Sequence, residues 1–420
     1  MKMKVKNLHF VFIILMLILV LRFQRISDIA VMIYTFVISL FQKFSETLSL
    51  INLSLIDNFV SFILLIILIL YLVPKGKSRL LLNKTVSLTS IVIIMLFTFF
   101  IFAPVVSTTD SDYQNDIGIS KLLPPFSEVK LLQQVNENSN GSDFVALRNR
   151  FLNENSIYID SIKKIGDDYF YFQKQAQTVA DRSKIKFKDN EPVVNSRFFI
   201  LGTDEFGRDI FSRLVYGTRI SMVVGLGAVL VSFLIGIGFG FLSGYSGRFL
   251  DTLLNRFTDM FLSIPVIFLI ILILTFFGNS IFTIIFILGF SGWMSLFKIV
   301  RSEVISIKQK DFFITASKIG LPDYKLLMNE ILPIIIAPVV VNLVFQYGNV
   351  ILAEAALSYL GLGTGLNYPS WGGMIEAGQE YLSQAWWMIF FPGFALILTL
   401  FTANNLGREL NQFFNPRISK

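Results

Sequence analysis

The chain has 420 residues, of which 54% are hydrophobic and 15% charged, with a formal net charge of +7. Soluble domains carry about a quarter charged residues, so this composition predicts an integral membrane protein. The absence of cysteine excludes disulfides, thiolate catalysis and cysteine-ligated metals, and one histidine predicts neither a metal site nor a catalytic base. The basic residues lie beside apolar runs, which favours membrane anchoring over nucleic-acid binding.

Residues 1–85 are expected to form an N-terminal membrane hairpin with spans at about 8–21 and 59–73. No small-residue cleavage site follows the first span, so we interpret it as uncleaved. The short apolar segment 29–41 is assigned to the membrane surface, because a third span would break the parity of the crossings. The basic residues after the second span predict a cytoplasmic loop; they are Lys75, Lys77, Arg79 and Lys84.

That basic loop also contains Gly76-Lys77-Ser78, which ends like a phosphate-binding P-loop. The P-loop needs a glycine five residues before its second glycine, and Tyr71 stands there. We therefore expect no ATPase motif in this chain and no enzymatic activity of its own.

The first span of the predicted core covers 86–106, and a polar external insert follows at 107–196. Apolar residues recur at helical spacing around Phe144 and Phe151 and again between Tyr158 and Val179, so the insert is predicted to be mainly helical. Asp167 and Asp168 would point to different sides of such a helix, which favours a solvated surface over a metal site.

Residues 197–420 hold five more predicted spans, at 220–241, 251–277, 281–300, 334–360 and 386–406. With 86–106 they make a six-helix core, with both chain termini in the cytoplasm. Five glycines between Gly225 and Gly240 predict close helix packing rather than a dinucleotide fingerprint. The outer loop after Leu360 has room for a short re-entrant helix.

Four polar residues interrupt the predicted span 334–360, namely Asn342, Gln346, Asn349 and Glu354. Polar side chains at this depth usually face other helices or an aqueous path, so these are candidate path or gating residues. Glu354 is the only acid between Glu330 and Glu376. Two interpretations of it stay open, a coupling or gating residue paired inside the bundle and an interfacial residue pointing into water.

A charged segment, 301–333, separates two of these spans. Its apolar residues recur at helical spacing from Phe312 to Ile319, Gly320 is expected to stop that helix, and Pro322 to begin a second one. Two short helices around a glycine form a knob that can dock in a groove of a soluble partner.

This segment resembles the coupling ("EAA") loop of permease subunits of ATP-binding-cassette (ABC) importers. Asp311-Phe312 stands at the start of the motif, Ile314-Thr315-Ala316 replaces Glu-Ala-Ala, and Ile331-Leu332-Pro333 closes it. The predicted ATPase-coupling residues are Asp311, Phe312, Thr315, Ala316, Gly320, Leu332 and Pro333.

Three further stretches resemble the dipeptide, oligopeptide and nickel permeases. They are the lead-in to the core from Leu201 to Ser221, the segment Glu354–Gly363 with Pro369–Met374, and the ending Asn415-Pro416-Arg417. The external motif residues are Gly202, Thr203, Asp204, Gly207, Arg208 and Asp209. We interpret them structurally, as an amphipathic helix on the outer membrane face, capped by Thr203 or Asp204, in which Asp204, Arg208, Asp209 and Arg213 pair.

The chain is thus identified as a C-type permease subunit of this importer family. The resemblance implies an all-α polytopic protein with a six-helix type I permease core at 86–106 and 197–420, to which the two N-terminal spans and the insert are added. It implies a bacterial cytoplasmic-membrane subunit that binds no cofactor or metal itself. ATP and Mg would lie on two cytoplasmic ATPase partners, and a second homologous permease and an external solute-binding protein would complete the importer.

Peptides are the expected substrate. The alternatives are nickel import within the same family and a stand-alone channel or secondary transporter. The last alternative explains the polar residues at depth but leaves the motif at 311–333 without a role.

Overall fold

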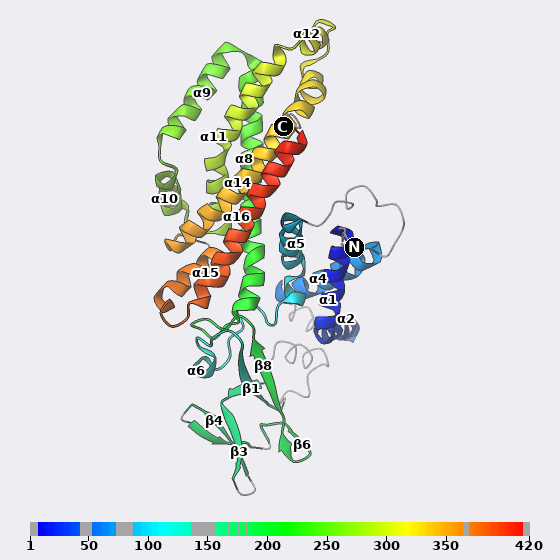
Figure 1. Cartoon of the computed structure of the whole chain (residues 1–420), viewed down its shortest axis with the longest axis vertical. Coiled ribbons are helices and arrows are strands. Elements are labelled where there is room, and N and C mark those ends of the chain that lie inside the picture. Colours follow the sequence, from blue (N-terminus) through cyan, green and yellow to red (C-terminus); the bar gives the residue numbers. More distant parts are fainter. Residues whose placement is uncertain are drawn as a thin grey trace, which may run out of the picture. The chain divides into compact units, whose positions relative to one another are not determined.

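The computed structural model describes residues 7–42, 53–72, 87–135, 156–165, 168–174, 176–181, 183–363 and 369–414; Figure 1 shows the elements in chain order. The chain divides into two compact units. The first comprises Met1–Arg219 with Ala377–Pro392, and the second Ile220–Glu376 with Gly393–Lys420. Several stretches used above lie outside the described residues, namely the basic loop 75–84, the insert segment 144–151, Asp167 and the ending 415–417.

Three helices form the described N-terminal region, α1 (Asn7–Leu21), α2 (Phe23–Gln42) and α4 (Leu53–Leu72). The segment assigned to the membrane surface lies in α2, where buried Ile29 and Met32 share one face and Val31 and Tyr34 are exposed. Of the two helices that hold the predicted N-terminal spans, α1 has 15 residues and α4 has 20.

Helix α5 (Leu88–Val106) corresponds to the first core span and begins at Ser87, whose hydroxyl accepts a hydrogen bond from the Ser90 N–H at 3.1 Å. Near its end the backbone leaves the helical region at Phe102 (φ −107°, ψ 24°). Pro104 has no N–H to donate to the carbonyl four residues earlier, at Phe100. Arg219 satisfies the freed carbonyls instead, with Nε 2.6 Å from Phe100 O and Nη2 3.0 Å from Ile101 O.

The N-terminal helices attach to this bent end of α5. Arg22 Nε donates to Val106 O at 3.1 Å, and Arg25 donates to the carbonyls of Pro104 and Thr108, both at 2.9 Å. On α4, Ser61 donates to Ile101 O at 2.9 Å and Asp57 pairs with Arg219. Since the last carbonyls of a helix have no partners within it and favour cations, these side chains complete the helix end.

The described part of the insert is built of strands, so the prediction of a mainly helical insert is wrong. Antiparallel sheets run in the orders β2-β1-β8, β3-β4-β5 and β6-β7. The strands are β1 (Ser127–Gln133), β2 (Ser156–Ile159), β3 (Ser161–Ile165), β4 (Asp168–Gln173), β5 (Ala176–Val179), β6 (Phe187–Lys188), β7 (Glu191–Pro192) and β8 (Val194–Phe199), with one short helix, α6 (Ile117–Ser120).

The reason lies in composition and strand length. The apolar residues of 158–179, the stretch predicted to be helical, are mainly aromatic or β-branched, and such residues fit pleated sheets. Its strands have only four to six residues, too few for a period of two to be told from helical spacing. Leu132, Ile159 and Ile185 form part of the small core of the insert.

The remaining core helices are α8 (Ile210–Ser246), α9 (Arg248–Ser263), α10 (Val266–Phe277), α11 (Ile281–Lys308), α14 (Leu332–Tyr359) and α16 (Trp387–Phe414). Among the described residues, five helices including α5 are long and apolar enough to span a membrane, and six if the bent pair α9 and α10 counts as one. This matches the predicted six-helix core.

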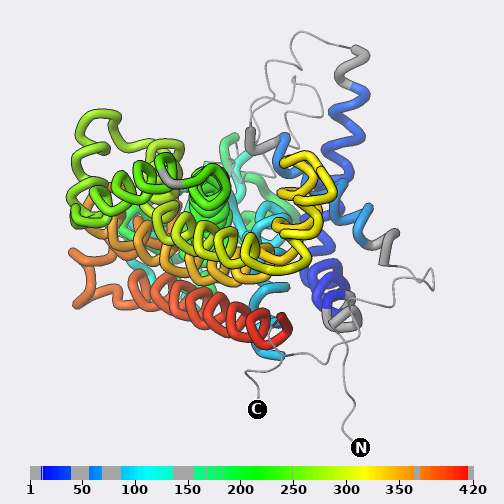
Figure 2. The backbone as a smooth tube through the Cα atoms, turned by 90° about the horizontal axis from the view of Figure 1, so that it is seen from above, coloured from blue at the N-terminus to red at the C-terminus, as the bar shows by residue number. Residues whose placement is uncertain are grey.

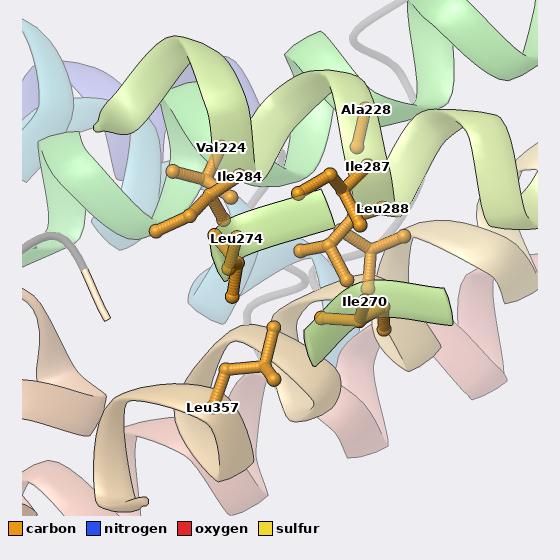
Figure 3. Close-up of a cluster of buried hydrophobic side chains, with 9 residues drawn as sticks. Val224, Ala228, Ile270, Leu274, Ile284, Ile287, Leu288 and Leu357 are labelled. Carbon is orange, nitrogen blue, oxygen red and sulfur yellow. The ribbon is translucent and has the colours of Figure 1, made fainter. Parts of the chain in front are cut away.

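The predicted span 251–277 is broken, because its two helices bend by 88°. The break falls at Ile264-Pro265, where proline removes a helical donor. Figure 3 shows the apolar cluster that buries one face of the second half, with Ile270 and Leu274 of α10 facing Ile284, Ile287 and Leu288 of α11.

Close packing of the glycine-rich span is confirmed where α8 meets α11. A Cβ on any of three glycines of α8 would lie 2.6–2.9 Å from the Cβ of an α11 side chain; the pairs are Gly236–Leu296, Gly240–Val300 and Gly244–Val304. Glycine at every fourth position thus forms a groove on α8 in which α11 packs, and any larger residue at these positions would fill the groove. In the second unit, α14 lies between α11 and α16 (Figures 1 and 2).

Candidate functional site

The segment 301–333 forms the predicted pair of short helices, α12 (Asp311–Lys318) and α13 (Asp323–Lys325), followed by a π-helical turn, η1 (Leu326–Ile331), that leads into α14. Between the helices Gly320 has φ +84°, and a Cβ there would meet no atom within 4 Å. The left-handed backbone, and not close packing, is therefore what requires glycine.

We call Asp311–Ile331 the knob. Phe313 anchors it, being 5% exposed and packed against Val304, Ile307 and Leu326. Several apolar side chains point outward instead, with exposed fractions of 42–76%; they are Phe312, Ile319, Tyr324 and Met328. An exposed apolar patch on an otherwise charged loop is typical of a protein-binding surface.

The other predicted coupling residues support the shape of the knob. Asp311 lies in the first turn of α12, where a negative charge is favourable, and its carbonyl accepts from the Thr315 hydroxyl at 2.8 Å. Ala316 and Leu332 are partly buried beside the Phe313 cluster, and Pro333 lies in the first turn of α14.

Contacts that no local sequence pattern predicts join the knob and α11 to the end of α8. The Tyr245 hydroxyl donates to the Asp323 carboxylate, and Lys308 Nζ donates to Tyr245 O at 2.8 Å. Nearby, Arg301 Nη2 lies 2.7 Å from the Asp251 carboxylate of α9. The knob is therefore joined directly to α8, and α11, which carries the knob, is joined to both α8 and α9.

Three of the four polar residues predicted at depth line one cavity. It has a volume of about 270 Å³ and lies between α11 and α14. Asn342, Gln346 and Asn349 share one face of α14 through their spacing of four and three residues, and Ser291 and Ser295 line the cavity from α11.

Glu354 is not part of that cavity lining. It is 1% exposed, so its interpretation as an interfacial residue pointing into water is wrong within this structure. Its Oε1 accepts from the Ser358 hydroxyl at 2.9 Å, while Oε2 has no partner. The predicted short helix in the outer loop, α15 (Trp371–Gly378), packs here, since a Cβ on Gly372 would lie 2.6 Å from Ala355 Cα.

The external motif forms a buried loop and not the predicted amphipathic helix, since the helix begins only at Ile210. Asp204 is 2% exposed and accepts from the Phe206 and Arg208 N–H groups, both at 2.9 Å, and from Arg208 Nε at 2.6 Å. Arg213 Nε lies 3.6 Å from the same carboxylate. The predicted pairing is therefore confirmed for these three residues, and burial beside Asp204 raises the pKa of the Glu205 carboxyl.

Asp209, and neither Thr203 nor Asp204, caps the following helix, because its carboxylate accepts from the Ser212 N–H at 3.1 Å and the Ser212 hydroxyl at 2.6 Å. It pairs with hydroxyls rather than with an arginine.

The rest of the loop holds the chain to the start of the insert. Thr203 Oγ1 accepts from the Leu123 N–H at 2.8 Å, and Trp387 Nε1 donates to Thr203 O at 3.1 Å. Gly202 has φ +82°, and a Cβ there would lie 2.5 Å from Leu123 O. Gly207 has φ +74°. These contacts give the motif a structural role, and the described residues contain no cluster of three or more His, Cys, Asp or Glu that could hold a metal.

Comparisons with known proteins place these features in context. Residues 236–420 match the family described as binding-protein-dependent transport system inner membrane component. The chain is 36% identical over 217 residues to the dipeptide transport system permease protein DppC of Alkalihalophilus pseudofirmus, covering 52% of this chain and 71% of that protein.

Two further relatives are similar over stretches of nearly the same length. The dipeptide transport system permease protein DppC of Bacillus subtilis is 35% identical over 220 residues, covering 52% of this chain and 69% of that protein. The oligopeptide transport system permease protein OppC of Haemophilus influenzae is 36% identical over 220 residues, covering 52% of this chain and 71% of that protein.

Proposed function

The chain belongs to the inner membrane components of binding-protein-dependent transport systems and is a multi-pass permease subunit of an ABC importer, and we propose that this importer carries short peptides. The observation that carries the coupling role is the knob, which is anchored by Phe313 and exposes Phe312, Ile319 and Tyr324. A membrane subunit that presents such a surface is suited to receive force from a soluble motor.

Peptide is favoured over nickel by the cavity between α11 and α14. Its polar lining consists of amides and hydroxyls, and it contains no thiolate, imidazole or carboxylate, the groups that bind divalent transition metals. The relatives named above are dipeptide and oligopeptide permeases.

In the proposed assembly, two cytoplasmic ATPase subunits carry ATP and Mg and bind the knobs of this chain and of a second homologous permease. An external solute-binding protein delivers the peptide. ATP binding draws the ATPase subunits together, the knobs move with them, and the path alternates between outward-open and inward-open states. A stand-alone channel or secondary transporter has no ATPase subunit for the knob to bind, so that alternative leaves the knob without a role.

Co-purification after mild solubilisation from the cytoplasmic membrane tests the assembly. We expect an ATPase subunit, a second permease and peptide-stimulated ATP hydrolysis when the solute-binding protein is added. Recovery of this chain as a homo-oligomer alone, without an ATPase, would support the channel alternative instead.

Coupling through the knob is tested with Gly320→Asp. The left-handed backbone disfavours aspartate only moderately, and no neighbouring atom blocks it, so the chain should still insert and assemble. We expect peptide-stimulated ATPase activity to fall at least tenfold, because the side chain alters the docking surface. Wild-type coupling at wild-type expression would contradict this role.

Orientation is tested with Lys318→Cys in this cysteine-free chain. Residue 318 ends α12, and we expect an impermeant thiol reagent to label it only after the membrane is opened. Labelling in intact cells would place the knob outside and remove the basis for ATPase coupling.

A further inference from the structure

We propose that the cavity between α11 and α14 binds the main chain of the peptide in transit, with the side-chain amide of Gln346 as its central hydrogen-bonding group. This inference rests on the proposed function and adds to it which part of the peptide, the main chain, the permease binds.

The first observation is that the Gln346 amide is buried and unmatched. Both Nε2 and Oε1 are inaccessible to solvent and have no hydrogen-bond partner among the described residues. An amide offers two donors and two acceptor lone pairs, and buried groups of this kind are nearly always hydrogen-bonded. A ligand that presents both a donor and an acceptor would satisfy the amide once the Gln346 side chain turns into the cavity that the residue lines.

The second observation is that neighbouring helices leave room for this amide. On α11, Gly292 faces it, and a Cβ on that glycine would lie 2.8 Å from Gln346 Cδ. On α8, Ser232 is fully buried and its hydroxyl is also unmatched, 3.1 Å from the same Cβ position. Unmatched polar groups from two helices therefore meet beside one glycine.

The chemistry of the lining indicates which part of a peptide is read. A peptide unit presents one N–H and one C=O, which match the acceptor and donor of a glutamine side chain. The cavity residues include no charged side chain, so no ion pair can select acidic or basic peptides. Phe345, Leu288 and Val350 add apolar contact that is independent of sequence. Such a site recognises the main chain and tolerates different side chains.

The test uses the whole transporter reconstituted in proteoliposomes with its solute-binding protein. Uptake of trialanine is compared with uptake of trisarcosine, whose N-methylated peptide bonds lack the N–H donor. The binding protein is the same in every sample, so a change in the trialanine-to-trisarcosine ratio between variants belongs to this chain.

We expect Gln346→Leu to lower trialanine uptake at least tenfold and to bring the ratio close to that of passive leakage. Gln346→Glu keeps the shape and adds a charge, so it should shift the preference between Ala-Lys-Ala and Ala-Glu-Ala at least tenfold toward the basic peptide. Gly292→Ala should reproduce the loss by displacing the amide without changing it. The matched control is Gln177→Leu on exposed β5, for which we expect wild-type uptake.

Three results would overturn the proposal. They are wild-type uptake and ratio in Gln346→Leu, an unchanged preference in Gln346→Glu, and loss of the second permease from the purified Gln346→Leu complex, which would make Gln346 a subunit-interface residue. A wild-type complex that imports no peptide would instead refute the proposed function.

Discussion

The external loop 202–213 and the cavity between α11 and α14 both contain polar side chains, and the two places differ in how those side chains are hydrogen-bonded. In the loop, Asp204 accepts from two backbone N–H groups and from Arg208, and Asp209 accepts from Ser212 twice. In the cavity, both atoms of the Gln346 amide are unmatched. A polar group that its own fold satisfies supports the fold, whereas a buried group without a partner lacks a hydrogen bond that a ligand can supply.

The comparison has direct consequences for stability. Removing a satisfied group leaves its partners unpaired and costs free energy, whereas removing an unsatisfied group removes a cost already present. The same type of substitution should therefore have opposite effects on folding in the two places.

The largest effect is expected for Asp204→Ala. It leaves Arg208 and Arg213, each 5% exposed, without their shared carboxylate, and breaking a buried ion pair from one side costs about 3–5 kcal/mol. Thermal unfolding of the detergent-solubilised chain should show a large fall in melting temperature or no folded protein. Asp112→Ala is the control, because this partner of Arg213 has a side chain that is 54% exposed and should matter little.

The next effect is expected for Gly202→Ala. The left-handed φ and the approach to Leu123 O act together, so we expect a loss of about 2–3 kcal/mol in the free energy of unfolding. Gly320→Ala is the matched control, with nearly the same φ but open surroundings, and should lose about 1 kcal/mol. Equal losses at the two sites would show that the packing around Gly202 is not tight.

Glu354 lies between the two extremes, with one carboxylate oxygen satisfied and one unmatched. In Glu354→Gln the amide oxygen can still accept from Ser358, so stability should change by less than about 1 kcal/mol. We expect peptide uptake to fall at unchanged expression, because the substitution removes a buried ionisable group from α14. Unchanged uptake and ATPase coupling would leave Glu354 with a structural role only.

The smallest effect on folding is expected for Gln346→Leu, the substitution that should be most damaging to transport. Since the amide has no partner, its removal should leave the free energy of unfolding unchanged or raise it by about 1 kcal/mol. A fall in melting temperature as large as that of Asp204→Ala would mean that Gln346 is part of the structural framework, and the contrast between the two places would disappear.

Local signals made the knob predictable from sequence. Gly320 and Pro322 are helix stop and start signals that act within a few residues, and the apolar spacing from Phe312 to Ile319 predicts one helix. Long apolar runs likewise placed α5, α11, α14 and α16. Asn342, Gln346 and Asn349 stood out for the same reason, as polar residues within one apolar run.

Features that depend on distant contacts could not be predicted from the sequence. The strands of the insert pair across many residues, as in β1 with β8, and their short runs carry no distinctive period. That Asp209 and not Thr203 caps α8 depends on where the chain turns. The unmatched state of Gln346 is visible only once three helices are placed around it.

The arginines that complete the end of α5 are synthesised well before the carbonyls that they bind. The carbonyls that Arg22 and Arg25 bind lie 79–84 residues later in the chain. A ribosome working at about 5–20 residues per second makes such a stretch in roughly 4–17 s. During that interval the first helices have left the ribosome but their guanidinium groups have no helix end to bind. The extra N-terminal region is therefore open to capture by insertion or quality-control factors until α5 arrives, and substitutions at Arg22 or Arg25 should show first as slower biogenesis.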